Sequence, residues 1–283
     1  MMRTGCEMSD PELGDLESRV VAANMRLHAE QAKVYRALNP QLYNFYNQRR
    51  MRRDADFIVN HLDDGRHTVN ILDLGCGTGL LSSHFLRYER CNVTALDLSA
   101  EMLSIFRESV SKEQADRLTL VNQEASEFIA DSIKKETLYS AVVMSALLHH
   151  LVDIGEFVRS ACKLIAPNGF LYVAFEPLRQ DIDRHSSRYC CHRAVRSLDE
   201  TCFNVELRLR GIKPETKGLA DYQLILGGVD PRDVVTGLGG GIEVVTLKKF
   251  CVRRSSILAF VSGSIIGSEN SFSLIARRVE WLY

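Results

Sequence analysis

The chain lacks the sequence features that mark several large classes of protein. Its 283 residues include eight cysteines, but no two of them form a C-x-x-C pair, the spacing that commonly marks zinc and redox sites. The formal net charge of -1 supplies no overall attraction for nucleic acid or for an anionic membrane. We therefore expect no nucleic-acid partner.

Segments suited to a membrane are also missing. The first ten residues have no apolar stretch of the kind that a secretory signal peptide needs. The longest apolar stretch near the C-terminus, residues 256–266, is too short and too rich in glycine and serine to span a bilayer. With 46% apolar residues, the chain can bury one large core. We expect a cytoplasmic protein without a membrane partner, as a monomer or a homodimer.

One group of cysteine and histidine residues invites a metal interpretation. It comprises His185, Cys190, Cys191, His192 and Cys202. Adjacent side chains diverge, so neighbouring cysteines are poor joint ligands for one tetrahedral ion. We predict reduced thiols and no metal, and a role in binding zinc or a thiophilic substrate is the alternative.

The most informative stretch is Asn70-Ile-Leu-Asp-Leu-Gly-Cys-Gly-Thr-Gly-Leu80. Its apolar first half predicts a parallel strand that is buried on both faces. The glycines that follow, Gly75, Gly77 and Gly79, lack a Cβ and let a ligand approach the backbone closely. A helix that opens at Thr78 or Gly79 would point its free N–H groups toward that ligand.

Two nucleotide ligands compete for such a loop. A dinucleotide fingerprint has the spacing G-x-G-x-x-G, whereas the glycines here stand at alternate positions. The loop also contains an acid, Asp73, two residues before the first glycine. A carboxylate would repel a pyrophosphate, but it suits the ammonium group of S-adenosylmethionine. The pattern therefore favours S-adenosylmethionine.

On these residues the chain resembles the class I S-adenosylmethionine-dependent methyltransferases, whose first motif is D/E-x-G-x-G-x-G. The resemblance covers residues 68–177 and, more weakly, residues 242–279. Residues 139–153 and 164–177 are similar to the small-molecule branch of the family, typified by quinone-biosynthesis methyltransferases.

The resemblance implies a cofactor site at the ends of successive strands. Asp97 would bind both ribose hydroxyls, and Leu98 would pack on the adenine. Glu124 would face the adenine amino group, at a position where family members usually carry aspartate. The full set implied for the cofactor is Asp73, Gly75, Cys76, Gly77, Gly79, Asp97, Leu98, Glu124, Ala125, Ser145 and Tyr46.

Alternating strand and helix patterns predict an α/β, Rossmann-like fold with helices on both faces of a mostly parallel sheet. Strands are expected near residues 69–74, 92–97, 118–122, 138–144 and 169–175. The resemblance adds an antiparallel pair at 242–247 and 271–277, which makes seven strands. The clearest helix is predicted for residues 153–166, with Asp153 as its N-cap and Pro167-Asn-Gly169 as its stop.

Four regions follow from these patterns. Residues 1–15 are expected to form a disordered leader, and residues 16–62 a helical lid that is broken at Asn39-Pro40. The core comprises 63–177 and 242–283. In this family such N-terminal helices commonly close over the cofactor, and permanent packing of these helices on the core is the alternative.

Residues 178–241 are predicted to form a cap that lines the acceptor pocket, because a connection this long is usually functional. Its first forty residues contain nine Lys or Arg and six Asp or Glu. This excess, together with the run from Arg49 to Arg53, points to a small-molecule acceptor that carries a carboxylate, a phosphate or a phenolate.

Methyl transfer requires a nucleophile in line with the methyl carbon and sulfur, so most of the acceleration can come from alignment. A base is needed only if the acceptor arrives protonated. His149 and His150 follow the fourth strand, at the sheet edge where ligands bind. We predict that one of them, preferentially His150, removes the proton; packing of His150 against the next helix is the alternative. Glu176, at the end of the fifth strand, would orient the acceptor or pair with a cap arginine.

The sequence thus predicts an S-adenosylmethionine-dependent methyltransferase of a small molecule, with the oxygen of a hydroxyl or carboxylate as acceptor. Nitrogen or carbon methylation is the alternative within the enzyme class. A protein that binds the cofactor for non-methylating chemistry or for regulation requires the same pocket and stays open.

Overall fold

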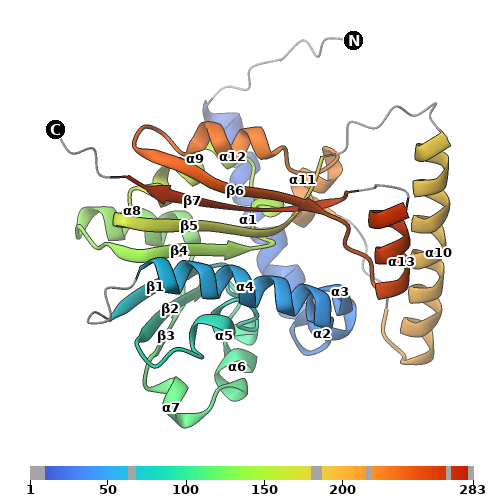
Figure 1. Ribbon diagram of the computed structural model, residues 1–283, viewed down its shortest axis with the longest axis horizontal. Helices are drawn as coiled ribbons and strands as arrows, with labels where there is room; N and C mark the ends of the chain where they lie inside the picture. Colours follow the sequence, from blue (N-terminus) through green and yellow to red (C-terminus); the bar gives the residue numbers. More distant parts are fainter. Residues whose placement is uncertain (1–9, 63–67, 180–186, 214–217, 266–268, 280–283) are drawn as a thin grey trace.

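A computed structural model describes residues 10–62, 68–179, 187–213, 218–265 and 269–279 (Figure 1). Most of the predicted leader lies outside these residues. The first helix, α1 (Asp10–Gln31), nevertheless begins before Leu16, where the helical segment was expected to start. None of the helices in the described part of the chain combines the length and apolar character that crossing a bilayer requires.

A seven-stranded sheet with the order β3-β2-β1-β4-β5-β7-β6 organises the fold (Figure 1). Its strands are β1 (Val69–Leu74), β2 (Cys91–Asp97), β3 (Leu118–Asn122), β4 (Tyr139–Ser145), β5 (Ile165–Pro177), β6 (Ile242–Phe250) and β7 (Ser271–Arg278). The first five strands are parallel, and β7 runs antiparallel to both β5 and β6. The Rossmann-like fold is confirmed, and the strand order reverses between β1 and β4, where ligands of open α/β sheets bind.

Helices cover both faces of the sheet (Figure 1). One core packs α4 (Phe45–His61), α5 (Ser82–Phe85) and α6 (Ala100–Ser109) against the sheet. The other core packs α8 (Ala125–Lys134), α9 (Ile154–Cys162) and α12 (Pro231–Gly237) against it. A further short helix, α7 (Lys112–Ala115), precedes β3.

Helix α9 has the predicted N-cap but ends earlier than predicted. Asp153 accepts a hydrogen bond from the backbone N–H of Glu156 at 2.9 Å. The helix stops at Cys162 instead of residue 166, because the fully buried Ile165 already pairs with Tyr139 of β4. Here the pairing of the apolar Ile165 with β4 is more favourable than a further turn of helix α9.

The N-terminal segment divides into two parts. The first comprises α1, η1 (Ala32–Val34), α2 (Tyr35–Leu38) and α3 (Pro40–Tyr43), and the predicted break falls at Asn39. The second part, α4, buries Met51, Ala55 and Ile58 completely against the sheet. Helix α4 is therefore a permanent layer of the core, and α1 to α3 are the segment to which the lid prediction still applies.

The cap contains α10 (Ser187–Leu209), η3 (Leu219–Asp221) and α11 (Tyr222–Ile225). Beside α10 stands α13 (Ser256–Phe260), followed by η4 (Val261–Ile265), both from the connection between β6 and β7 (Figure 1). Asp199 of α10 accepts hydrogen bonds from the backbone N–H groups of Arg254 and Ser255. Residues 251–265, expected to belong to the core, thus extend the cap.

Candidate active site

Two cavities lie at the carboxyl ends of the parallel strands. The smaller cavity has a volume of about 100 Å³ and the larger one of about 660 Å³. His28, Tyr35, Ala146 and His150 line both cavities. The two cavities are therefore neighbours that share one wall.

The glycine loop forms one side of the smaller cavity. Gly75, Gly77 and Gly79 all adopt a positive φ, which favours glycine. A Cβ at Gly79 would lie 2.0 Å from the ring of Phe106, whereas a Cβ at Gly77 would meet nothing within 4 Å. Gly79 is thus required for packing, and the backbone at Gly77 faces open space.

No helix opens at Thr78 or Gly79, contrary to the prediction. The chain forms turns up to Leu81, and α5 begins at Ser82. The positive φ of Gly79 (+81°) interrupts helical geometry at this point. The N–H groups of the loop are donated within the protein instead: that of Cys76 to Leu96, that of Gly77 to Asp97 and that of Gly79 to Cys76.

Asp97 lies beside this loop at the end of β2. Its Oδ2 accepts a hydrogen bond from the N–H of Gly77 at 2.7 Å, and its Oδ1 accepts one from Ser99 at 2.9 Å. Burial raises the pKa of Asp97, and these two N–H donors oppose the shift. Each oxygen retains a further lone pair, so the carboxylate can accept two hydroxyl donors from a ligand.

The remaining walls of the smaller cavity are largely apolar. Gly75, Gly77, Asp97, Leu98, Glu124, Ala125 and Ser145, all predicted for the cofactor, line it. The Glu124 carboxylate caps α8 by accepting from the N–H of Glu127 at 2.9 Å, which leaves it partly committed to the helix. Gln123 and Met102 also line the cavity and were not predicted.

Four predicted residues do not line the smaller cavity: Asp73, Cys76, Gly79 and Tyr46. Asp73 is completely buried and accepts a hydrogen bond from the Ser82 hydroxyl at 2.6 Å. Burial raises its pKa to about 7. Asp73 therefore forms part of the buried interior beneath the loop. The prediction that it contacts the ammonium group of the cofactor is not supported.

Tyr46 is 66% exposed on the outer side of α4. Its neighbour Asn47 begins the buried face of this helix, which turns Tyr46 toward solvent. Tyr35 of α2 lines both cavities instead. Nothing in the sequence distinguished Tyr35, because its position depends on how α2 lies over the sheet.

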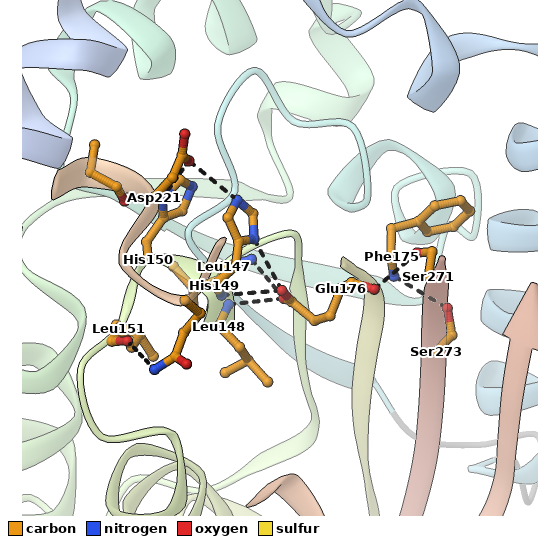
Figure 2. A network of polar contacts seen from close by, with 12 residues as sticks. Leu147, Leu148, His149, His150, Leu151, Phe175, Glu176, Asp221, Ser271 and Ser273 are labelled. Atoms are coloured by element: carbon orange, nitrogen blue, oxygen red, sulfur yellow. Dashed lines mark hydrogen bonds and ion pairs between the residues drawn. The ribbon is translucent and has the colours of Figure 1, made fainter. Parts of the chain in front are cut away.

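Glu176 forms the centre of a polar network at the shared wall (Figure 2). Its side chain is fully buried and accepts from the backbone N–H groups of Leu147, Leu148 and His149 at 2.8, 2.9 and 3.2 Å. Its Oε2 also lies 3.1 Å from Nδ1 of His149. The Glu176 side chain lines neither cavity, and its partners within the described residues are these N–H groups and His149, with no cap arginine among them.

A β-bulge directs Glu176 into this network. The register of β5 against β7 shifts between Val173 and Glu176, and Phe175 adopts a φ of +57°. A bulge of this kind re-aims the side chain that follows it. The N–H of Phe175 donates to the Ser273 hydroxyl at 3.2 Å, which holds the bulge in place (Figure 2).

Asp221 of η3 joins the two histidines (Figure 2). Its Oδ1 lies 3.9 Å from Nε2 of His149 and 3.7 Å from Nδ1 of His150. His150 Nδ1 donates to the carbonyl of Ala220 at 2.6 Å, and burial holds the pKa of His150 well below its usual value. Asp221 was not predicted, because only the folded cap brings it beside residues 149–150.

His28 of α1 completes the wall between the cavities. Its ring lies edge-on to that of His150, with 5.0 Å between centroids. Burial lowers the pKa of His28, and the nearby Asp97 carboxylate opposes this. The imidazoles of residues 28, 149 and 150 therefore converge where the two cavities meet.

The larger cavity combines apolar and charged walls. Leu38, Phe175, Phe203 and Leu207 supply apolar surface, and Arg196, Asp199, Glu200, Arg253 and Arg254 supply charge of both signs. The guanidinium of Arg254 lies 4.1 Å from the centroid of the Phe203 ring. No residue of the run from Arg49 to Arg53 lines this cavity, and Arg50 stacks over Phe250 at 3.7 Å instead.

Three members of the predicted group of cysteine and histidine residues lie in the described part of α10 with their side chains. Cys190, Cys191 and Cys202 are exposed, free thiols on α10. His185 and the side chain of His192 lie outside the described part of the chain.

Comparisons with known proteins agree with this geometry. A family model described as a methyltransferase domain matches residues 72–171. An uncharacterized methyltransferase of Schizosaccharomyces pombe is 29% identical over 136 residues, 46% of this chain and 47% of the relative. A ubiquinone biosynthesis O-methyltransferase of Erwinia tasmaniensis is 33% identical over 41% of this chain and 46% of the relative. The chain thus spans about half the length of the curated relatives it matches.

The fold also resembles solved methyltransferases. Magnesium protoporphyrin IX methyltransferase from Synechocystis PCC 6803, solved with S-adenosylhomocysteine, aligns with a TM-score of 0.53 at 13% identity. The alignment covers 90% of this chain and 99% of that chain. A likeness at this identity concerns the fold alone.

The smaller cavity presents groups that suit a nucleoside. Gly77 leaves open space beside the backbone, Asp97 can accept from ribose hydroxyls, and Leu98 and Ala125 offer apolar contacts to a base. Together with the matched methyltransferase domain, these residues point to the adenosine part of S-adenosylmethionine. Residues 72–171 form the methyltransferase domain that the family model describes, in the fold of solved methyltransferases, and S-adenosylmethionine is the cofactor of this domain.

Proposed function

We propose that the protein methylates a hydroxyl oxygen of a small molecule held in the larger cavity. The observation that carries this proposal is the pair of His149, which lines the larger cavity, and the buried Glu176 behind it, next to His150 on the wall that the larger cavity shares with the smaller one. When bound, the cofactor supplies a methyl group on a positively charged sulfur. A hydroxyl acceptor must then lose a proton, and this wall holds groups that can take it.

His149 is the better placed of the two histidines for this task. Its Nδ1–H donates to Glu176, which leaves Nε2 as the acceptor atom of the neutral ring. A carboxylate behind an imidazole fixes the tautomer and stabilises the protonated ring, as in other acid–base pairs of this type. The alternative base, His150, uses its Nδ1 on the carbonyl of Ala220 and has no carboxylate in hydrogen-bond contact.

The other residues would position the acceptor. Phe175, Phe203 and Leu207 offer an apolar wall for a ring or chain, and Arg196 and Arg253 enter the same cavity. Because Arg253 is nearly buried, an acidic group beside it would be held in a partly desolvated pair. We therefore propose an acceptor that combines an apolar body, a hydroxyl and an anionic group.

Carbon or nitrogen methylation is the second candidate. A carbon or amine nucleophile that needs no deprotonation would be served by alignment alone, and the cavity itself does not exclude it.

Incubation with cofactor that carries a ¹³C-labelled methyl group, together with candidate hydroxyl compounds, tests the proposal. The expected result is S-adenosylhomocysteine and a product whose methyl carbon has the NMR shift of an O–CH₃ group. Asp97→Ala should abolish the signal. An N–CH₃ or C–CH₃ shift would overturn the oxygen assignment while keeping the methyltransferase.

A further inference from the structure

Two buried carboxylates, Glu176 and Asp221, flank the two histidines. Glu176 is 0% and Asp221 7% exposed. Within the described residues, their ion pairs are with His149 and His150, and Glu176 also accepts three backbone N–H groups. Buried carboxylates are costly unless they are paired and hydrogen-bonded, and a bound cation is one partner that meets this need.

We propose that His149, His150 and Asp221 form a binding site for a divalent transition-metal ion. One ligand atom from each residue lies within 4.8 Å of the other two. Two imidazoles and one carboxylate are a donor set that suits ions such as Zn²⁺, Fe²⁺, Mn²⁺ and Ni²⁺. The ion would add the positive charge that this wall needs.

The observed distances are close to those of a loaded site. Asp221 Oδ1 lies 3.9 Å from His149 Nε2 and 3.7 Å from His150 Nδ1. Ligands that are about 2.1 Å from one ion stand roughly 3.0–3.4 Å apart. The two Asp221 distances would each have to shorten by less than about 1 Å, and the contact of 2.6 Å between His150 Nδ1 and the carbonyl of Ala220 would have to open.

The outer contact of His149 also matches a metal site, whereas His150 would have to exchange a contact. A metal-bound histidine almost always donates its other ring N–H to a carboxylate or a backbone carbonyl. His149 does so through its Nδ1 contact of 3.1 Å to Glu176, and its Nε2 then faces Asp221. His150 would bind through Nδ1 and carry its hydrogen on Nε2, exchanging its present contact to the carbonyl of Ala220 for the ion.

The position of the site gives the ion a role. All three residues line the larger cavity, and His150 also lines the cofactor pocket. An ion with three protein ligands keeps a coordination position for an outside molecule. Building on the proposed function, an oxygen atom of the acceptor would occupy that position as an alkoxide or phenolate whose proton has passed to solvent, and the ion would orient it toward the cofactor. With the ion bound, Nε2 of His149 is a ligand and does not act as the base; in the metal-free protein it would keep that role.

Cobalt binding to the full chain, first freed of metal by dialysis against a chelator, tests the site directly. Co²⁺ has visible absorption bands that report coordination by nitrogen and oxygen. We expect one ion per chain, and an affinity at least about 100-fold lower in Asp221→Asn and in His149→Gln. Glu176→Gln, which alters the outer contact of His149 and the hydrogen bonds to the loop after β4, should weaken binding by about 10–100-fold.

A matched control is available on α10. The triple variant Cys190→Ser, Cys191→Ser, Cys202→Ser removes three exposed thiols and should bind cobalt as the wild type does. Loss of binding in this variant, or unchanged binding in Asp221→Asn, would place the ion elsewhere and overturn the proposal, as would the absence of any bound cobalt.

Calorimetry with S-adenosylhomocysteine separates this proposal from the proposed function. Each variant should bind S-adenosylhomocysteine within about threefold of the wild type, which shows that it is folded. If S-adenosylhomocysteine binds and methyl transfer proceeds while cobalt does not bind, the metal site is wrong and the methyltransferase assignment stands.

Discussion

The Oε2 atom of Glu176 lies 3.1 Å from Nδ1 of His149, although Glu176 stands near the end of β5, His149 lies in the turn η2 (Leu148–His150) after β4, and the two are 27 positions apart in the chain (Figure 2). Glu176 also accepts three backbone N–H groups from the segment that carries His149. The contact orients the imidazole and, at the same time, shapes the loop that follows β4. Substitutions at either position should therefore affect the acceptor side of the site more than the cofactor side.

The first prediction concerns His149. His149→Ala should lower turnover by about 10²–10⁴-fold, the usual contribution of a positioned acid–base group. Because His149 lines only the larger cavity, the affinity for S-adenosylhomocysteine should change by less than about threefold. Steady-state rates and calorimetry check both numbers. His61→Ala, at an exposed position at the end of α4, is the matched control. A loss of less than tenfold would favour an acceptor that needs no activation.

The second prediction concerns the cofactor. Asp97→Ala should weaken S-adenosylhomocysteine binding by about 2–4 kcal/mol, since two charge-assisted hydrogen bonds are lost with partial compensation by water. Glu124→Gln should cost less than about tenfold in affinity, because one Glu124 oxygen is committed to the N–H of Glu127. Calorimetry on both variants decides the point. Equal losses would mean that the ribose is not held by Asp97.

The third prediction follows from the burial of Asp73. Its pKa is raised from 3.8 to about 7 in the folded protein, so folding favours the protonated acid. The stability that it contributes is complete below pH 3.8 and is lost as the pH rises toward about 7. Asp73→Asn keeps an oxygen that can accept from Ser82 but cannot ionise. Its stability relative to the wild type should therefore increase between pH 4 and pH 7 and stay constant above that.

The shift in the pKa of Asp73 limits the pH-dependent change in the free energy of unfolding, relative to Asp73→Asn, to roughly 4 kcal/mol. Denaturant unfolding of the wild type and the variant at several pH values measures it. The exposed Asp116→Asn is the control for the same substitution at the surface. If the free energies of unfolding of the wild type and of Asp73→Asn changed with pH in parallel, the buried carboxyl would not change its protonation on folding.

The fourth prediction concerns the lid. The smaller cavity, at about 100 Å³, is well below the roughly 300–1,000 Å³ of most ligand pockets, and Val21, Asn24 and His28 of α1 form part of its wall. We expect α1 to shift when the cofactor binds. Hydrogen exchange in α1 should slow markedly with S-adenosylhomocysteine, because lids belong to the less stable parts of a structure. Exchange in α4 should be slow in both states, and an unchanged α1 would argue for a fixed layer.

The core of the fold was predictable because its signals are local. Buried strands such as β1 appear as short apolar runs, and Asp153 caps α9 through its own neighbours in sequence. Asp97 and Gly77 were also accessible from sequence, since a strand end and a glycine turn place them within one βαβ unit. Each of these features is specified by a few residues that are close together in the sequence.

The polar network around His149 and His150 was decided by the tertiary structure. Asp221 reaches His149 and His150 from the cap, His28 reaches them from α1, and a bulge in β5 aims Glu176 at the loop after β4. Tyr35 lines the smaller cavity, whereas the predicted Tyr46 is exposed. This difference also depends on how the N-terminal helices lie on the sheet. Local propensity carries no information on these contacts, because their geometry depends on how elements far apart in the sequence pack against one another.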